Sequence, residues 1–185
     1  MTEKEKMLAG EVYSATDPEL LSELNEVKDA IHRYNALLPS QLSERLQMLK
    51  ALLGHVGDDE VFINQPFYCD YGKHISVGHH FFANFNLTIL DEARVTIGDD
   101  CFFGPNVSIY TACHSTDPTE RNTRQEWARP VTIGHNVWIG GSVTILPGVT
   151  IGASSVVVSD IPSGTFAVGN PCRVVRTIGQ NEKTR

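Results

Sequence analysis

The chain has 185 residues, of which 41% are hydrophobic and 20% are charged, and its formal net charge is −7. This composition suits one folded domain with an appendage and excludes a disordered chain. The acidic balance argues against nucleic acid or an anionic membrane as the main partner. The sequence has no apolar run long enough for a bilayer, no signal peptide and no Cys-x-x-Cys pair, so we expect a cytoplasmic protein with reduced thiols.

Residues 1–57 are predicted to form a helical cap. Apolar residues recur at helical spacing, with charges between them, at Leu20, Leu24, Val27, Ile31 and Tyr34. Asp17 before Pro18 has the form of an N-cap followed by proline at the first helical position. A second helix, ending at Gly54, is indicated by Leu42, Leu46, Leu49 and Leu53. The segment MLAGEVY is a candidate for a shorter, earlier helix.

Residues 131–152 repeat with a period of six. Isoleucines lie six apart at 133, 139, 145 and 151, and three of them are followed by glycine. Valines keep the same step at 137, 143 and 149. Neither a helix nor one long strand has this period, whereas a short strand followed by a corner does, which is the hexapeptide β-helix pattern. We expect the aliphatic side chains to point inward, and the small residues to sit at corners where a Cβ would crowd the turn.

The six-residue step extends backwards through the chain. Inward positions are predicted at Val77, Ala83, Ile89, Ile97, Phe103 and Ile109. We therefore expect the β-helix to occupy residues 58–178, with a frayed tail at 179–185. Between Ile109 and Ile133 the step is interrupted by eighteen extra residues, which predicts an extruded loop at about 113–130 with His114 at its root. Loops of this length are often functional. Near the C-terminus, residues 166–168 predict a short strand, followed by a turn and a basic tail.

Four features occur together: the hexapeptide coils, EKMLAGEVYSATDPEL in the cap, FFANFNLTILD, and TACHSTDP at the start of the loop. In this combination the chain resembles the maltose/galactoside O-acetyltransferase family of hexapeptide-repeat acyltransferases, from about residue 4 to 178. The resemblance implies a left-handed parallel β-helix and a homotrimer with active sites between neighbouring subunits. It also implies acetyl-CoA as co-substrate, a sugar as acceptor, and no requirement for a metal.

The resemblance assigns His114 as the general base that deprotonates a sugar hydroxyl. The chemistry is reasonable because an alcohol is a weak nucleophile and imidazole is the usual base near neutral pH. The backbone N–H of Gly141 corresponds to the donor that stabilises the oxyanion. The positions that match sugar-binding residues are Asp17, Asp70, Asn84, Asp91 or Glu92, and Trp138. Those that match CoA-binding residues are Gly141, Ser142, Ser159, Arg173 and Arg176.

Simpler roles remain open for several of these residues. Asp17 has the position of an N-cap, Asn84 of a corner residue, and Trp138 of a packing residue between subunits. Arg173 and Arg176 suit phosphate through their planar guanidinium groups, but also suit a solvated tail.

One departure from the family pattern concerns the last coil. After Ile151-Gly152 the next position in step is Val157, and the chain then leaves at Asp160-Ile161-Pro162. Relative to the family, about one hexapeptide is missing. Its loss predicts a shortened CoA groove.

We therefore expect direct acetyl transfer from acetyl-CoA to a maltose- or glucose-like hydroxyl. The alternatives are another acceptor, such as an oligosaccharide or a xenobiotic, or a non-catalytic trimeric scaffold with an impaired CoA groove. A zinc enzyme of the carbonic-anhydrase type would need three converging histidines. None of the other six histidines pairs with His114 at a close spacing in the loop.

Overall fold

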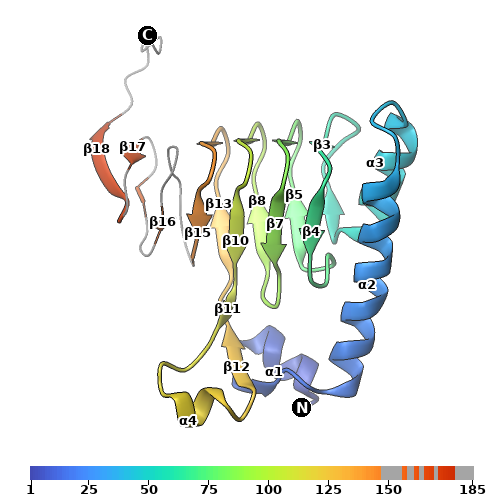
Figure 1. Ribbon diagram of the computed structural model, residues 1–185. Coiled ribbons are helices and arrows are strands. Elements are labelled where there is room, and N and C mark those ends of the chain that lie inside the picture. Colours follow the sequence, from blue (N-terminus) through green and yellow to red (C-terminus); the bar gives the residue numbers. More distant parts are fainter. Residues whose placement is uncertain (147–155, 158–160, 163–164, 169–170, 178–185) are drawn as a thin grey trace.

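The computed structural model describes residues 1–146, 156–157, 161–162, 165–168 and 171–177. Over these residues the chain forms a left-handed parallel β-helix whose first coil is covered by helices (Figure 1). The predicted fold class is therefore confirmed. In the described ranges, no helix has the length and apolar character needed to cross a membrane.

Three parallel sheets form the faces of the β-helix, and the chain visits them in turn. Face A consists of β2 (His55–Val56), β5 (Ile75–Val77), β8 (Val95–Ile97) and β13 (Val131–Ile133). Face B consists of β3 (Phe62–Ile63), β6 (Phe82–Ala83), β9 (Phe102–Phe103) and β14 (Trp138–Ile139). Face C consists of β4 (Phe67–Cys69), β7 (Leu87–Leu90), β10 (Ser108–Tyr110), β15 (Thr144–Ile145) and β16 (Val156–Val157).

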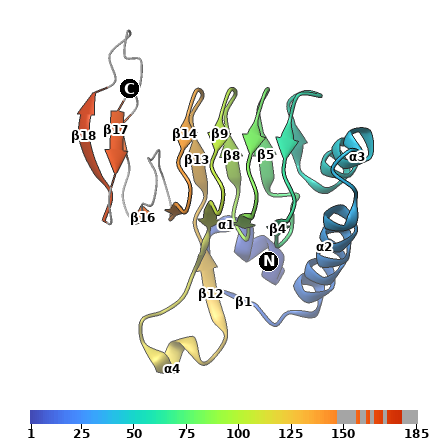
Figure 2. The ribbon, with the colours of Figure 1, turned by 45° about the horizontal axis from the view of Figure 1, so that its top comes forward.

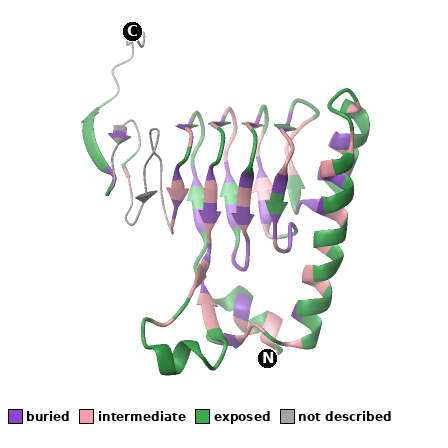
Figure 3. Ribbon diagram, viewed as in Figure 1, coloured by how far each residue is buried: buried purple, intermediate pink, exposed green. Residues whose placement is uncertain are grey.

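The predicted inward positions stack to form one continuous core. Ile97 pairs with Ile133 in neighbouring coils, and Ile109 pairs with Ile145. The described members of the six-residue series are buried, and buried residues alternate with accessible ones along the strands (Figure 3). Val149 and Ile151 lie outside the described residues.

In the three coils that follow the first, two corners are turned by a residue in the left-handed region of φ. At the A–B corner these residues are His80, Asp100 and Asn136, with φ between 55° and 58°. At the B–C corner they are Asn86, Asn106 and Ser142, with φ between 58° and 63°. Asparagine and aspartate tolerate this conformation better than most residues with a Cβ.

Two of the corner glycines are required for close stacking, as the sequence predicted. A Cβ on Gly98 would lie 2.8 Å from the backbone of Gly134 in the next coil, and one on Gly104 would lie 2.6 Å from the backbone nitrogen of Gly141. Glycine is needed at these two positions because successive coils stack too closely for a side chain. The prediction that a Cβ would be crowded was correct, but the turning itself is done by other residues.

The last described coil is shorter than those before it. Thr88 pairs with Ser108, twenty residues later, whereas Thr144 pairs with Val156, only twelve residues later. A regular coil of three hexapeptides has eighteen residues, so this register matches the predicted loss of one hexapeptide. Residues 147–155, which make the connection, lie outside the described residues.

The cap contains α1 (Glu3–Ala9), α2 (Pro18–Ala36) and α3 (Leu42–Leu52). Asp17 is the N-cap of α2 as predicted, since its Oδ1 accepts the N–H of Glu19 at 3.0 Å. The first helix begins earlier than predicted because Thr2 forms a capping box. It ends before the EVY segment because Gly10 adopts a left-handed C-cap.

Helices α2 and α3 cover the open end of the β-helix. Tyr34, Leu49 and Leu53 are buried in the same core as Ile63 of the first coil. Leu42 is exposed, contrary to the helical pattern. Arg45 is buried in that layer instead, and its Nη2 donates to the Ile63 carbonyl at 2.8 Å. The hydroxyl of Tyr34 donates to the same carbonyl, so two polar side chains of the cap hydrogen-bond the end of this strand.

The extruded loop is ordered around β11 (Ala112–Cys113), α4 (Pro118–Arg121) and β12 (Gln125–Ala128). Strands β11 and β12 pair antiparallel, and β1 (Tyr13–Ser14) from the cap pairs with the other edge of β12. This small sheet projects from the β-helix body next to α1 (Figures 1 and 2). The sequence predicted the extrusion but not its pairing with the cap.

The C-terminal segment contains an antiparallel pair, β17 (Thr165–Val168) and β18 (Arg173–Thr177). The predicted strand is present, whereas residues 169–170 of the predicted turn lie outside the described residues. The predicted basic tail is itself the second strand of this hairpin.

The close stacking at Gly98 gives a direct test of the fold. Gly98→Ala should destabilise the protein by roughly 1–3 kcal/mol, because the added methyl group meets backbone rather than a flexible side chain. The expected result in a thermal melt is a Tm several degrees lower. Gly134→Ala is the matched control in the same column, since no described atom lies within 4 Å of its added Cβ. Equal melting temperatures for the two variants would contradict the stacking account.

Candidate active site

His114 follows β11 directly at the root of the projecting loop. Cys113 pairs with Trp127 across the β11–β12 ladder, which brings His114 beside Glu126. The Nδ1 atom of His114 lies 3.3 Å from Oε2 of Glu126. The His114 side chain is 56% exposed, whereas that of Glu126 is only 13% exposed. A proton on Nδ1 that is shared with the carboxylate leaves the Nε2 lone pair available to accept another proton.

Glu126 is in turn held by the cap. The hydroxyl group of Tyr13 donates a hydrogen bond to Oε1 of Glu126, and Tyr13 itself is buried. Neither residue was identified from the sequence. They lie 113 positions apart, and only the antiparallel pairing of β1 with β12 places them opposite each other. No local motif signals such a contact.

The corner between faces C and A carries a group of carboxylates. Asp70 follows β4, and Asp91 and Glu92 follow β7, so strand stacking brings them to one edge. Asp91 is fully buried, and its Oδ1 accepts the N–H groups of Asp70 at 3.0 Å and Tyr71 at 2.9 Å. This carboxylate therefore orders the turn, and its burial leaves no surface for a sugar.

Glu92 is the second carboxylate of the predicted pair. It is 8% exposed, and its Oε2 lies 3.2 Å from the hydroxyl oxygen of Thr111. Burial, reinforced by the neighbouring carboxylates of Asp70 and Glu126, raises the pKa of Glu92 to about 8. A protonated carboxyl group at neutral pH can donate a hydrogen bond as well as accept one.

A second group of predicted residues lies on face B and at the B–C corner. Trp138 on β14 is 65% exposed. Asn84, just after β6, uses its Oδ1 to accept the N–H of Phe85 at 2.8 Å. Among the described residues, no acceptor is found for the N–H of Gly141, while the next N–H, that of Ser142, donates to the Pro105 carbonyl at 2.8 Å.

The two groups do not meet within one chain. His114, Asp70 and Glu92 lie where the strands of face C end, whereas Asn84 and Gly141 lie where those strands begin. The two groups are therefore separated by at least the length of a strand of face C, which is about 10 Å for four residues. The predicted site residues thus form two separate parts within one chain.

Face B carries a column of aromatic side chains that point outward. In register from coil to coil these are Phe62, Phe82, Phe102 and Trp138. Phe62 is 40% exposed and Phe102 is 52% exposed. The rings of Phe82 and Phe102 have centroids 6.2 Å apart. Contiguous exposed apolar patches are, in general, often surfaces that bind a ligand or another protein.

The remaining predicted positions are dispersed. Asp17 lies at the start of α2, where its carboxylate is engaged as the N-cap. Arg173 and Arg176 lie on β18 and are exposed, and Nη1 of Arg173 donates to the Cys172 carbonyl at 2.8 Å. Ser159 lies outside the described residues.

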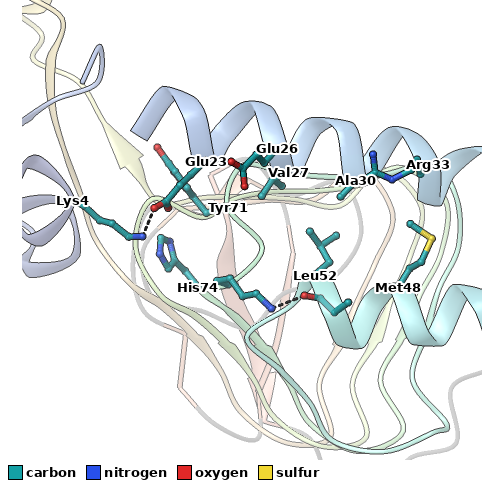
Figure 4. A pocket seen from close by; sticks show the side chains of 12 residues that line it. Lys4, Glu23, Glu26, Val27, Ala30, Arg33, Met48, Leu52, Tyr71 and His74 are labelled. Atoms are coloured by element: carbon teal, nitrogen blue, oxygen red, sulfur yellow. Dashed lines mark hydrogen bonds and ion pairs between the residues drawn. The ribbon is translucent and has the colours of Figure 1, made fainter. Parts of the chain in front are cut away.

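Two cavities lie beside α2. One, of about 460 Å³, is lined by Asp70 together with residues of α2 and β4. The other, of about 550 Å³, lies between α2, α3 and the first coil, and none of the predicted site residues lines it (Figure 4). Lys4 and Glu23 form an ion pair at 2.5 Å across its rim. The described part of the chain holds no group of three or more His, Cys, Asp or Glu residues that could hold a metal ion.

Comparison with known proteins identifies similar sequences and structures. The family model for the maltose acetyltransferase hexapeptide capping motif matches residues 6–57, and the model for the hexapeptide repeat of succinyl-transferase matches residues 94–111 and 130–158. Nodulation protein L of Rhizobium meliloti (strain 1021) is 49% identical, over 94% of this chain and 97% of that protein.

Solved structures match over nearly the whole chain. The maltose O-acetyltransferase from Clostridium difficile 630 is 45% identical with a TM-score of 0.93, covering 97% of this chain and 99% of that chain. A galactoside acetyltransferase in complex with coenzyme A is 36% identical with a TM-score of 0.91, covering 97% of this chain and 92% of that chain.

The raised pKa of Glu92 predicts a specific pH dependence of stability. Between its ordinary pKa near 4.5 and about 8, the folded state keeps a proton that the unfolded state has released, so this group lowers stability as pH rises through that window. Glu92→Gln should therefore melt several degrees higher than the wild type at pH 8.5, with little difference at pH 4.5. Glu44→Gln, at an exposed position on α3, is the control. A Tm difference for Glu92→Gln that does not grow with pH would refute the assignment.

Proposed function

The chain belongs to the maltose/galactoside O-acetyltransferase family of hexapeptide-repeat acyltransferases, and we propose that it transfers the acetyl group of acetyl-CoA to a hydroxyl of a maltose- or glucose-like sugar. The relatives support both substrates: one solved structure is a maltose O-acetyltransferase, and another is a galactoside acetyltransferase in complex with coenzyme A. The observation that carries the assignment of the reacting groups is the contact between His114 and Glu126.

His114 acts as the general base. Its Nδ1 faces Glu126, so Nε2 is the atom that takes the proton from the attacking hydroxyl. The sugar oxygen adds to the thioester carbonyl, the C–S bond of the tetrahedral intermediate then breaks, and the CoA sulfur leaves with the proton returned by His114. Glu126 stabilises the imidazolium that exists between these two steps.

The oxyanion of the intermediate requires a fixed donor. The N–H of Gly141 is suited to this role because no described residue accepts from it and it lies at a glycine corner that a substrate can approach closely. We place the pantetheine arm along Gly141, Ser142 and Trp138. Arg173, Arg176 and Ser159 remain candidates for the nucleotide end.

The acceptor lies against polar groups of both corners. Glu92 and Asp70 suit sugar hydroxyls, and a neutral Glu92 can donate to one oxygen while accepting from another. Asn84 offers an amide from the other corner. Asp17 at the start of α2 is a further candidate, and it can serve as N-cap and sugar ligand together.

A homotrimer resolves the separation between the two groups. If face B of one subunit packs near the projecting loop of its neighbour, the Asn84 and Gly141 of one chain meet the His114 and Glu92 of the next. The exposed aromatic column on face B supports this arrangement, since burying it on association is favourable.

The assignment of the base is tested by turnover. Thiol release from acetyl-CoA in the presence of glucose, maltose or a galactoside should fall by at least about a hundredfold in His114→Ala. Binding of CoA to the variant, followed by calorimetry, should be unchanged. Retained sugar-dependent release in His114→Ala would exclude this histidine as the base.

The assignment of the site to two subunits is tested by mixing inactive variants. Trimers of His114→Ala and of Asn84→Ala should each have low activity. The two variants are then dissociated, mixed in equal amounts and reassembled. An interface is intact when one chain contributes Asn84 and its neighbour contributes His114, which random mixing gives at about a quarter of the interfaces. Activity should therefore recover to about a quarter of the wild-type value. Absence of recovery, with hybrid trimers confirmed by native mass spectrometry, would place both residues in the same subunit's site.

A further inference from the structure

We propose that Tyr13, on the N-terminal cap, is a positioning residue for the reaction: it fixes Glu126 so that this carboxylate holds His114 with the proton on Nδ1. The inference rests on the proposed role of His114 as base. It extends that role by linking the cap to the reaction through three side chains from three segments of the chain.

The backbone makes this chain of contacts specific. Tyr13 and Glu126 are directly paired residues of the antiparallel β1–β12 ladder. In the same sheet, β12 pairs with β11, whose last residue precedes His114. The strand from the cap therefore lies on one side of β12 and the histidine on the other, with Glu126 reaching both. Its Oε1 accepts from Tyr13, and its Oε2 lies 3.3 Å from Nδ1 of His114.

Tyr13 is suited to a fixed role as donor. It is 2% exposed and packs in a small separate core with Met7, Leu20 and Tyr71. Burial, together with the negative charge of Glu126, raises the pKa of the Tyr13 hydroxyl far above its usual value. The hydroxyl thus stays protonated across the working pH range, and one of the two carboxylate oxygens is always engaged. The other oxygen is left in one orientation, toward His114.

A purely packing role for Tyr13 would use its ring but not its hydroxyl group. The hydroxyl contributes a further constraint, because the backbone pairing of β12 with β11 and β1 fixes where Glu126 lies in the sheet but not how its carboxylate is rotated. Without the donor, the carboxylate would be free to rotate away from His114. The imidazole would then populate both neutral tautomers, and only the one with a free Nε2 lone pair is productive.

The test compares Tyr13→Phe with Tyr34→Phe. Tyr34 is the matched control because it is also a fully buried tyrosine of the cap, and its hydroxyl donates to the Ile63 carbonyl on the side of the first coil. Both variants lose one buried hydroxyl group and keep the ring. Turnover with acetyl-CoA and maltose is measured for each, alone and combined with Glu126→Gln, and melting temperatures report folding.

We expect Tyr13→Phe to lower kcat by about tenfold or more with little change in KM, and Tyr34→Phe to leave kcat unchanged even if it lowers Tm. In the Glu126→Gln background, Tyr13→Phe should change kcat by less than about twofold, because the group it positions is gone. Equal kcat for Tyr13→Phe and wild type, or the same fold loss with and without Glu126, would overturn the proposal.

A second readout does not depend on turnover. In protein with ¹⁵N-labelled histidine, the His114 signals, assigned by their loss in His114→Ala, should show the Nδ1-protonated tautomer in wild type and a mixture in Tyr13→Phe. An unchanged tautomer in Tyr13→Phe would overturn the positioning role. Turnover retained in His114→Ala would show that the proposed base is wrong. The tautomer of His114 would still decide, separately, whether Tyr13 positions the histidine.

Discussion

The close stacking of one coil on the next is the constraint on which the rest of the structure depends. Inward residues such as Ile97 and Ile133 bury their side chains only because the coils lie in register, and Gly98 is required where the backbones approach too closely for a Cβ. The same register carries every corner residue to a fixed column. A site built at a corner is therefore positioned by a rigid scaffold, and an eighteen-residue insertion can project from it without disturbing the core.

The inserted loop is held in place at both of its strands. Its first strand continues from face C, and its second strand is paired on the far side by β1 of the cap. This arrangement brings His114 next to the carboxylate of Glu126, and the charge of Glu126 in turn acts on the buried Glu92. The cap thus has two roles: α2 and α3 close the end of the β-helix, while β1 supports the loop.

The sequence predicted the features that repeat and missed those that do not. The six-residue period located the inward residues from Val77 to Ile145, and the break in that period located the loop and His114. The residues that turn the corners in the left-handed region, such as Asn106 and Asp100, were not identified from the sequence. Glu126 and Tyr13 were not predictable, since an antiparallel contact between segments so distant in sequence leaves no periodic trace.

The most direct test of the proposed site is a crystal structure of the protein with coenzyme A and a maltose-like sugar. We expect a trimer in which a sugar hydroxyl lies about 3 Å from Nε2 of His114. The CoA sulfur should lie beside Gly141 of the neighbouring subunit. A CoA sulfur bound away from the projecting loop, or a sugar bound in the cavity between α2 and α3, would contradict it.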